Sequence, residues 1–321
     1  LGGPEVGFQE DRPAVSDMAD YVVMGAAEKS FAVLCEMILA GNRPLERFIQ
    51  SDEQPLDKLI LPYKYYSDED IRNRLIYVEA SRGCPFKCEF CLSSLDRTSK
   101  PFELGSFLDE MDELYQRGAR NFKFIDRTFN LKVSSSIAIL EFFLQRMSDD
   151  LYLHFEVVPD NLPDKLKEVI QRFPQHALQF EIGVQSFDED IQALISRKQN
   201  NQKSIENLKW LRESSHAYIH ADLIFGLPSD TLENFADSFN RLVSLNPHEI
   251  QLGILKRLRG VPLNRHNKHY RMRYNPEAPY NILQTRDIDF PTMQRVNRFA
   301  RFWDMIANSG RFKSTLPLIL G

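Results

Sequence analysis

The strongest constraint on the fold is a regular alternation of short apolar runs with helical patterns between Leu75 and about Leu255. Each apolar run has the length of one buried strand, and the patterns between the runs repeat apolar residues at helical spacing. Such repetition predicts a parallel sheet whose strands are joined by helical crossovers. The predicted strands cover residues 75–80, 122–125, 151–158, 177–184, 218–225 and 249–255. Eight units would close a standard barrel, so six predict an α/β fold with an open, partial (β/α)6 barrel.

Residues with strong capping preferences predict where two of the helices begin. Ser106, followed three residues later by Asp109, predicts a capping box at the start of the first helix, and Gly118 predicts its end. Ser134 or Ser135 is expected to cap the second helix. Further helices are predicted over residues 164–173, 188–195, 203–212 and 231–245.

Three cysteines follow the first predicted strand, at Cys84, Cys88 and Cys91, with the spacing C-x3-C-x2-C. A structural zinc ion takes four ligands, and a [4Fe–4S] cubane normally takes four cysteines. Three thiolates would therefore leave one iron of a cubane open to another ligand. Two alternatives are a zinc site completed by a distant histidine and buried thiols without metal. In sheets of this kind functional groups lie at the carboxyl ends of the strands, where this loop is predicted.

The composition outside the cysteine loop argues against a secreted disulfide-rich protein, a nucleic-acid-binding protein and a membrane protein. Cys35 lies in an apolar helical pattern with Phe31, Leu34 and Ile38, so it is predicted to be a core residue. Four cysteines in 321 residues are too few for a secreted disulfide framework. The net charge of −5 gives no electrostatic case for a nucleic-acid partner. No apolar run approaches the ~18 residues of a membrane span, and no signal-peptide pattern is present. We therefore expect a cytoplasmic protein that does not enter a membrane.

The run from Cys84 to Cys91, with Phe90 before the last cysteine, resembles the signature of radical S-adenosylmethionine (SAM) enzymes. The resemblance implies a [4Fe–4S] cluster on three cysteines, with the open iron chelated by the amino and carboxylate groups of SAM. It implies an electron donor such as flavodoxin or ferredoxin, cleavage of SAM to a 5′-deoxyadenosyl radical, and hydrogen abstraction from an unreactive carbon. It also implies a reducing, anaerobic setting. Phe90 would contact the adenine through its backbone.

Two acidic residues near later strand ends resemble positions of the same family. Asp126 follows the second predicted strand, where family members contact the SAM amino group; the alternative is an ordinary Asx turn. Glu156 lies in the third strand and resembles a glutamate of the coproporphyrinogen-oxidase-like subgroup. A carboxylate inside such a strand is costly unless it is paired. The alternative for Glu156 is a solvent-facing position.

The fourth and fifth predicted strands match more specific motifs of that family. In Gly183-Val184-Gln185-Ser186, the resemblance implies that Gln185 approaches the ribose hydroxyls of SAM. Arg197 would face the SAM carboxylate, because a guanidinium binds both oxygens, or would instead lie on a helix surface. Residues 221–228 match the fifth-strand motif, in which Ile224 and the backbone near Gly226 would form the adenine wall. The alternative is a buried strand that ends in a turn.

The N-terminal part resembles the tail of a cobalamin-binding Rossmann-like domain. Gly2 and Gly3 form a Gly-Gly loop, and residues 19–28 resemble the last strand and the turn after it, although relatives usually have Gly-Glu-Gly-Glu where residues 25–28 are Gly-Ala-Ala-Glu. The axial-histidine motif D-x-H-x-x-G would lie upstream of Leu1. With that motif, Gly2 and Gly3 would line the pocket for the cobalamin nucleotide tail; the alternative is a degenerate remnant. Both ends are expected to be cut from a longer chain.

The C-terminal part begins with a basic run. Residues 256–273 carry seven lysines and arginines and no acidic residue. This run could be a solvated surface, pair with distant acidic residues, or roof the active site and bind an anionic substrate. Residues 252–262 resemble an uncharacterised extension of some cobalamin-linked radical SAM proteins. From Pro291 a helix that ends at Gly310 is predicted, with an apolar side formed by Val296, Phe299, Trp303 and Ile306.

These features predict a remnant of a Rossmann-like domain over 1–45, a linker over 46–74, a core over 75–256 and a small, mostly helical extension over 257–321. The resemblance implies a radical SAM enzyme that acts on a small molecule or peptide, with cobalamin-dependent methyl transfer as the favoured outcome. One alternative is a cobalamin-independent rearrangement, oxidation or methylthiolation. The other is a non-catalytic zinc or iron–sulfur protein.

Overall fold

The main sheet has six strands, and every neighbouring pair is parallel. The computed structural model describes residues 1–8, 12–52, 54–96 and 98–320. From one edge to the other, the strands are β3 (Ile76–Val78), β6 (Asn121–Phe124), β7 (Tyr152–Val157), β8 (Leu178–Gln185), β9 (Tyr218–Phe225) and β10 (Glu249–Ile254). Because this is also their order in the sequence, each crossover joins adjacent strands, as predicted.

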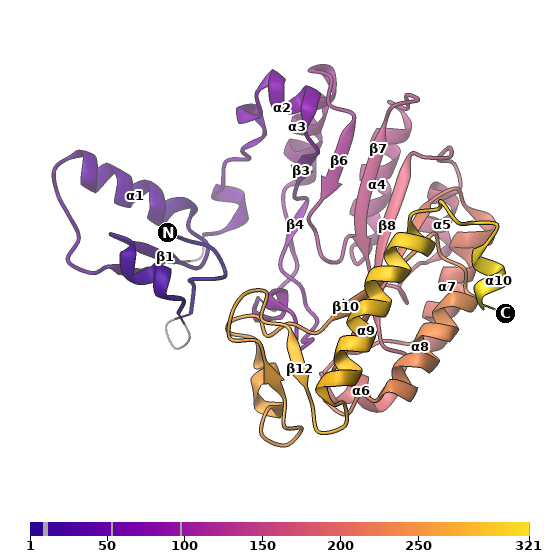
Figure 1. The fold of residues 1–321 in the computed structure, drawn as a ribbon. Helices are drawn as coiled ribbons and strands as arrows, with labels where there is room; N and C mark the ends of the chain where they lie inside the picture. The colour runs from indigo at the N-terminus through magenta and orange to yellow at the C-terminus, as the bar shows by residue number, and fades with distance from the viewer. Residues whose placement is uncertain (9–11, 53, 97, 321) are drawn as a thin grey trace.

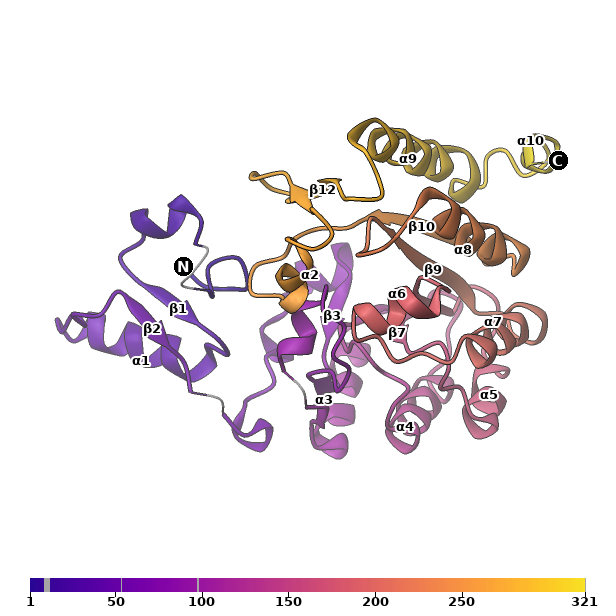
Figure 2. The same cartoon turned by 90° about the horizontal axis from the view of Figure 1, so that it is seen from below.

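Helices cover the outer face of this sheet, which curves into an arc that stays open on one side (Figure 2). The covering helices are α3 (Leu104–Gln116), α4 (Val133–Leu144), α5 (Asp164–Ile170), α6 (Glu189–Leu194), α7 (Asn201–Ser214) and α8 (Leu232–Ser244). The arc and its outer helices confirm the predicted partial barrel. The carboxyl ends of the strands therefore converge at one end of the arc.

The two faces of the sheet differ in chemistry because burial alternates strictly along β8 and β9. In β9, Ile219, Ala221 and Leu223 are fully buried toward the helices, whereas His220 and Asp222 point to the concave face and are only half-buried. β8 repeats this pattern. Strands of all-parallel sheets usually read as continuous apolar runs because both faces are packed. The alternation therefore indicates that the concave side is a polar surface rather than a second core.

Phenylalanines dominate the core between the sheet and its helices. The ring of Phe155 on β7 lies 4.0 Å from that of Phe129 and 4.4 Å from that of Phe124. Phe122 on β6 packs against Phe143 on α4 at 5.1 Å. Burying one such side chain stabilises the fold by about 1.5–3 kcal/mol. The strand end that precedes Phe129 is consequently held by dense packing.

The predicted starts of the first two helices are wrong, although the predicted stop is confirmed. α3 begins before Ser106, and its cap is Glu103, whose carboxylate accepts hydrogen bonds from the backbone N–H of Gly105 and Ser106 at 2.9 and 2.6 Å. A glutamate can replace a serine cap here because two carboxylate oxygens reach two free N–H groups. α4 begins at Val133 without a side-chain cap. Gly118 follows α3 with φ 101°.

The N-terminal unit contains a small sheet of its own and stands beside the barrel (Figure 1). β1 (Val22–Met24) pairs in parallel with β2 (Phe48–Gln50), and α1 (Glu28–Leu39) joins them. β2 lies in the predicted linker, so the unit extends beyond its predicted end; the same stretch also contains α2 (Asp68–Asn73). Cys35 on α1 is half-buried rather than a core residue, because this side of α1 borders an open groove with Gly2.

The C-terminal extension returns across the open side of the arc and then packs along α8 (Figures 1 and 2). It comprises the 3-10 helix η5 (Pro262–His266), the antiparallel pair β11 (Arg273–Tyr274) and β12 (Ile282–Gln284), then α9 (Phe290–Trp303) and α10 (Leu316–Leu320). The helix predicted from Pro291 is confirmed. Val296 and Trp303 are buried, whereas Phe299 keeps 41 % of its surface exposed while its ring touches Phe239.

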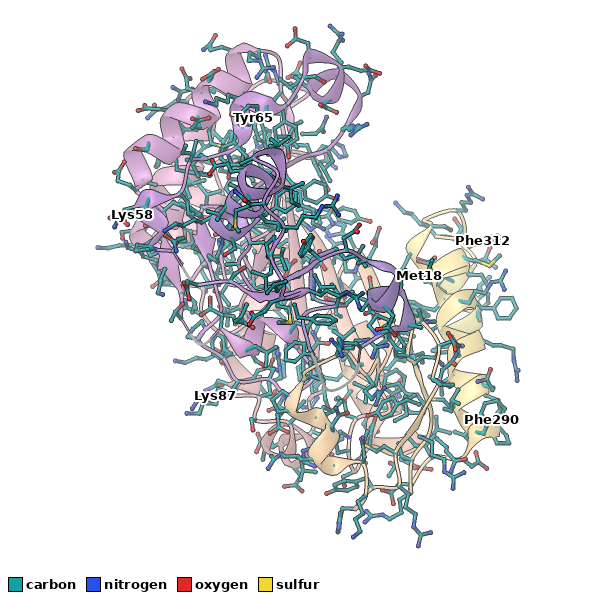
Figure 3. The ribbon with its side chains drawn as sticks, turned by 90° about the vertical axis from the view of Figure 1, so that its left-hand side faces the viewer. Met18, Lys58, Tyr65, Lys87, Phe290 and Phe312 are labelled. Atoms are coloured by element: carbon teal, nitrogen blue, oxygen red, sulfur yellow. The ribbon has the colours of Figure 1, made fainter. Side chains whose placement is uncertain are left out.

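Among the residues that the structure describes, no helix combines the length and apolar character needed to cross a bilayer. Exposed side chains, both apolar and charged, are scattered over the surface. Lys58, Phe290 and Phe312 lie at the edges of the molecule in Figure 3, and Met18 is also exposed.

Candidate active site

The cysteine loop leaves the carboxyl end of β3 through a tight turn. β4 (Ser81–Arg82) pairs with β5 (Lys100–Pro101) and closes the base of the loop. Between them Gly83 has φ 91°, and a Cβ at this position would lie 2.2 Å from the carbonyl oxygen of Thr98. Only glycine fits there. Within the loop, Lys87 points to solvent (Figure 3), whereas Cys88 is buried, so the turn directs the thiol inward.

All three loop cysteines open onto one cavity of about 250 Å³ at the carboxyl ends of the strands. Four of the other residues predicted to serve the site also line it, namely Phe90, Glu156, Gln185 and Arg197. They come from the loop, β7, β8 and the segment after α6. The partial barrel thus brings together residues that are up to 113 positions apart in the sequence (Cys84 to Arg197).

Arg197 connects the cysteine loop to the end of β8. Its Nη1 lies 3.6 Å from the Cys88 sulfur, its Nη2 donates to the carbonyl oxygen of Gly183, and its Nε donates to Gln199 at 3.1 Å. Burial raises the pKa of the Cys88 thiol, and the positive charge of Arg197 opposes this effect. Since thiolates are the metal-binding form of cysteine, Arg197 favours the form that a metal centre needs.

Gln185 lines the cavity and has an unusual backbone conformation at the end of β8. The ladder between β8 and β9 shifts register between Gly183 and Gln185, and Gln185 has φ 68°. Such an irregularity at a strand end re-aims a side chain. A Cβ on Gly183 would lie 2.5 Å from the Gln185 Nε2, so the missing side chain makes room for the amide. The Gln185 Oε1 is buried without a hydrogen-bond partner, which is rare unless a ligand supplies one.

Glu156 has the charged partner that its buried position required. Arg127 Nη1 donates to both of its carboxylate oxygens, at 2.7 and 2.9 Å. Burial raises the pKa of Glu156, and the charge of Arg127 lowers it in part. Arg127 also lines the cavity and was not singled out in the sequence, because it lies in a loop without a periodic pattern.

Asp126 does not line this cavity, and its predicted contact with SAM stays a prediction. Its Oδ2 accepts from the backbone N–H of Ala80 at 2.9 Å, and its Oδ1 accepts from the Ser81 hydroxyl at 2.6 Å. Burial raises the pKa of Asp126 to about 6. Through these two hydrogen bonds the carboxyl anchors the start of the cysteine loop.

Ile224 and Gly226 also lie outside the cavity lining. Gly226 has φ 91°, and a Cβ there would lie 2.7 Å from the Ile282 Cγ2 and 3.2 Å from the Met293 Cε. Close approach of the C-terminal extension therefore accounts for this glycine. Gly2 and Gly3 lie in the N-terminal unit, where Gly2 bridges to Val23 beside β1. The predicted ligand contacts of Ile224, Gly226, Gly2 and Gly3 stay predictions.

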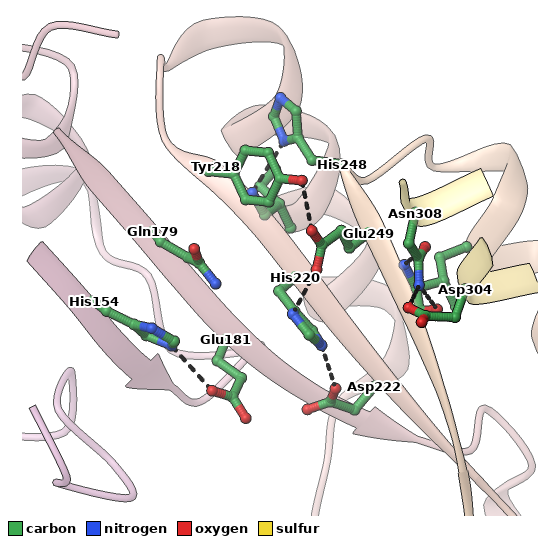
Figure 4. Close-up of polar contacts among 12 residues, drawn as sticks. His154, Gln179, Glu181, Tyr218, His220, Asp222, His248, Glu249, Asp304 and Asn308 are labelled. Atoms are coloured by element: carbon green, nitrogen blue, oxygen red, sulfur yellow. Dashed lines mark hydrogen bonds and ion pairs between the residues drawn. The ribbon is translucent and has the colours of Figure 1, made fainter. Parts of the chain in front are cut away.

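A network of charged side chains covers the concave face below the cavity (Figure 4). Glu181 contacts His154 at 3.0 Å and Lys123 at 3.3 Å. The hydrogen bond from His154, together with Lys123, lowers the pKa of Glu181 to about 2. Glu181 itself lines the cavity, so the network begins at the cavity wall.

The second half of this network surrounds His220. Its ring nitrogens lie 3.1 Å from Asp222 and 3.1 Å from Glu249, which also accepts from the Tyr218 hydroxyl. Burial lowers the pKa of His220, but the contact with Asp222 and the negative charges of Asp222, Glu249 and Glu181 together outweigh it, so the pKa is raised. Sequence reasoning missed these residues. Alternation of polar residues within strands expected to be buried on both faces was the available signal.

Among the described residues, no group of three His, Cys, Asp or Glu side chains converges on a single-ion site. The cavity offers three thiols, a guanidinium, an unpaired amide oxygen and ion-paired carboxylates. This donor set fits a thiolate-bound cluster with a polar co-ligand. An amino-acid carboxylate would meet Arg197, and a hydroxyl would meet Gln185.

Two family models match the chain. The radical SAM superfamily model matches residues 78–242, and a model described as a protein of unknown function (DUF4080) matches residues 268–321. The first match covers the cysteine loop and most of the sheet. The second covers only the extension.

Curated relatives include an uncharacterized methyltransferase of Pyrococcus horikoshii, 26 % identical over 263 residues, covering 73 % of this chain and 55 % of the relative. A tRNA-2-methylthio-N(6)-dimethylallyladenosine synthase of Thermotoga petrophila is 26 % identical over 208 residues, covering 62 % of this chain and 45 % of the relative. The chain spans about half the length of these relatives.

Two solved structures share the fold at low sequence identity. The radical S-adenosylmethionine methyltransferase TsrM of Kitasatospora setae has a TM-score of 0.60 and 17 % identity, covering 76 % of this chain and 53 % of its own. The cobalamin-dependent S-adenosylmethionine radical enzyme OxsB has a TM-score of 0.57 and 14 % identity, covering 83 % of this chain and 41 % of its own. Both show the architecture of the barrel.

Proposed function

The chain belongs to the radical SAM superfamily, and on this premise we propose that Cys84, Cys88 and Cys91 hold a [4Fe–4S] cluster at which SAM is cleaved reductively. The observation that carries the proposal is the single cavity that joins the three thiols to Arg197 and the unpaired oxygen of Gln185. When bound, the cluster supplies one electron that breaks the sulfonium C–S bond of SAM. The hard chemistry is the cofactor's, and the protein positions and shields it.

The residues of the cavity have separate roles in this proposal. Arg197, already beside the Cys88 sulfur, would bind the SAM carboxylate next to the open iron. Gln185 would accept a hydrogen bond from a ribose hydroxyl, which supplies the missing partner of its buried Oε1. Glu156 is held by Arg127 at the cavity wall, so its carboxylate is oriented before any ligand arrives.

A cobalamin-dependent methyl transfer is the outcome we favour. The fold shared with TsrM and OxsB, the methyltransferase among the relatives and the β1–α1–β2 unit support it. The charged concave face favours a polar small-molecule or peptide substrate over an apolar one, since buried charges need polar partners. Flavodoxin or ferredoxin would supply the electron.

Anaerobic reconstitution with iron and sulfide, followed by addition of a chemical reductant in the presence of SAM, tests the core proposal. We expect 5′-deoxyadenosine and methionine in the product, a loss of 5′-deoxyadenosine with Cys88→Ala, and no change with Cys35→Ala. Cys35 is the matched control because it lies in the N-terminal unit, away from the loop. A colourless protein that binds zinc and leaves SAM intact would contradict the proposal and return the three cysteines to a structural role.

Product analysis of the full-length protein separates the reaction classes. S-adenosylhomocysteine that forms only with added cobalamin supports methyl transfer. Cleavage of SAM that does not depend on cobalamin would instead support a rearrangement, an oxidation or a methylthiolation, the last being the reaction class in the name of the Thermotoga relative.

A further inference from the structure

Glu89 lies between Cys88 and Cys91, and both oxygens of its carboxylate accept hydrogen bonds. None of these contacts is part of the cofactor site proposed above. Its Oε1 accepts from the Ser196 hydroxyl at 2.6 Å and from Arg265 Nη2 at 2.6 Å, and its Oε2 accepts from Arg265 Nε at 2.8 Å. His266 Nε2 lies 3.0 Å from the same Oε2. The side chain of Glu89 is 6 % exposed, whereas that of Arg265 is 60 % exposed, so the arginine reaches a buried carboxylate from the surface. A paired fork of this kind fixes orientation as well as charge.

The backbone of Glu89 is held on both sides as well. Its N–H donates to the carbonyl oxygen of Ile195 at 3.0 Å, just after α6, and its carbonyl oxygen accepts from the N–H of Leu263 at 3.1 Å. The cysteine loop is thus clamped between the α6 end and the 3-10 helix η5 of the C-terminal extension. Two elements distant in sequence set the position of the residue between Cys88 and Cys91.

The same part of the extension also grips the N-terminal unit. Arg259 is buried, and its Nε donates to Glu5 Oε1 at 3.0 Å while its Nη2 donates to the Tyr280 hydroxyl at 3.0 Å. Gly260 has φ 78°, and a Cβ there would lie 2.1 Å from the ring of Phe8. The ring of Phe8 therefore rests directly on the extension, and only glycine permits this contact.

The two grips are joined by a short and well-packed connection. Only five residues lie between Arg259 and Arg265, and two of them, Val261 and Leu263, are buried in the core. Figure 2 shows this segment lying between the N-terminal unit and the barrel. A chain of this length spans at most about 20 Å. The packing of its buried residues further restricts how far it can move. Both sets of contacts therefore lie on one short segment that is packed into the core.

We propose that residues 259–266 are a strap that positions the cysteine loop relative to the N-terminal unit, with Glu89 and Arg259 as its two anchors. The strap includes two arginines of the basic run, and their contacts decide between the alternatives stated for that run. Arg265 and Arg259 pair with distant acidic residues rather than facing an anionic substrate. The purpose of this positioning rests on the proposed function: the strap would hold the cluster at a fixed position opposite a ligand of the N-terminal unit. The mechanical link itself does not depend on that function.

Hydrogen–deuterium exchange of the apo-protein tests the link without any cofactor. With Arg265→Ala, we expect exchange at the Glu89 and Cys91 amides to rise about tenfold, because the loss of one charge-assisted hydrogen-bond pair is of that order. Arg265→Lys, which keeps the charge but not the fork, should give a smaller rise. Lys268→Ala is the matched control, since it removes an exposed charge from the same run. Arg265→Ala indistinguishable from this control would overturn the proposal.

The coupling is tested from the opposite end of the strap. Arg259→Ala should raise exchange in residues 1–8 and also in residues 84–91, although its partners Glu5 and Tyr280 both lie outside the cysteine loop. An increase confined to residues 1–8 would show two separate contacts and no strap. If Arg259→Ala fails to fold, Glu5→Gln weakens the same grip from its exposed partner and gives the same pair of outcomes.

A second readout separates positioning from mere stability. After reconstitution to equal iron content, the electron paramagnetic resonance spectrum of the reduced cluster should respond to SAM in wild type and weakly or not at all in Arg265→Ala, with Arg265→Lys between them. Equal responses in all variants would leave only a structural role. A protein that forms no cluster would contradict the proposed function. The exchange experiments need no cluster, so they would still test the strap independently.

Discussion

Glu89 and Arg265 are 176 residues apart in the sequence, yet both nitrogens of the arginine fork lie within 2.8 Å of the two oxygens of the glutamate. The first residue belongs to the cysteine loop and the second to the extension that follows the sheet. Their pairing places the extension directly against the cysteine loop. Removal of Arg265 would leave the charge of the buried Glu89 carboxylate less compensated, which is costly.

Gly226 gives the clearest prediction for packing between barrel and extension. Gly226→Ala should lower the free energy of unfolding by about 2–4 kcal/mol, because the new methyl group meets Ile282 at 2.7 Å in a left-handed backbone. Gly118→Ala is the matched control: its φ is 101°, but nothing lies within 4 Å, so only about 1 kcal/mol should be lost. Urea unfolding followed by circular dichroism measures both. Equal losses would show that backbone strain alone accounts for Gly226.

Asp230 should make the protein less stable as the pH rises. It accepts from the N–H of Gly226 at 3.0 Å, and burial raises its pKa from 3.8 to about 7. Between these values the folded protein binds a proton that the unfolded chain has lost, so stability falls as pH increases from about 4 to 7.

Asp230→Asn should therefore gain stability relative to wild type by about 2–4 kcal/mol more at pH 8 than at pH 4. Urea unfolding at a series of pH values measures this difference. Asp237→Asn, at an exposed position of α8, is the control and should show no such trend. A difference that is independent of pH would mean that Asp230 is ionised in the folded protein.

Glu181 should show the opposite pH dependence. The contacts with His154 and Lys123 hold the pKa of Glu181 at about 2, below its ordinary value of 4.5. Its stabilising contribution is thus present above about pH 4.5 and is lost as the pH falls toward 2. Glu181→Gln should cost about 1–3 kcal/mol at pH 7 and progressively less below pH 4.

The measurement for Glu181 is the same unfolding series, extended to acid. Glu168→Gln, an exposed glutamate on α5, serves as the control. Should the cost of Glu181→Gln stay constant down to pH 3, the ion pairs of the concave face would not be what stabilises this carboxylate.

Arg197→Lys tests the carboxylate-binding role directly. Lysine keeps the positive charge but cannot bind two oxygens, so the KM for SAM should rise about tenfold at equal iron content. The rate of 5′-deoxyadenosine formation at a range of SAM concentrations measures it. Lys203→Ala, on the exposed side of α7, should leave the KM unchanged. An unchanged KM in Arg197→Lys would assign Arg197 to its Gly183 and Gln199 contacts alone.

Local patterns in the sequence were sufficient to predict the strands, most helices and the cysteine loop, because each depends on neighbours along the chain. The predicted strand over 218–225 coincides with β9, since its apolar alternation is decided within the segment. The helix starts were less predictable. Glu103 competes with Ser106 for the same free N–H groups, and only the backbone path decides which side chain reaches them.

The candidate site divides in the same way. The strand pattern of the sequence predicted that the cysteine loop would lie at the carboxyl ends of the strands, and the family resemblance predicted that Gln185 and Arg197 would serve the same site; all five residues line one cavity. Only the tertiary structure decided that Asp126 anchors the loop backbone, that Gly226 makes room for Ile282, and that Glu89 receives Arg265. These outcomes depend on contacts between segments far apart in the sequence. No periodicity or spacing within one segment encodes which distant side chain will pack against it.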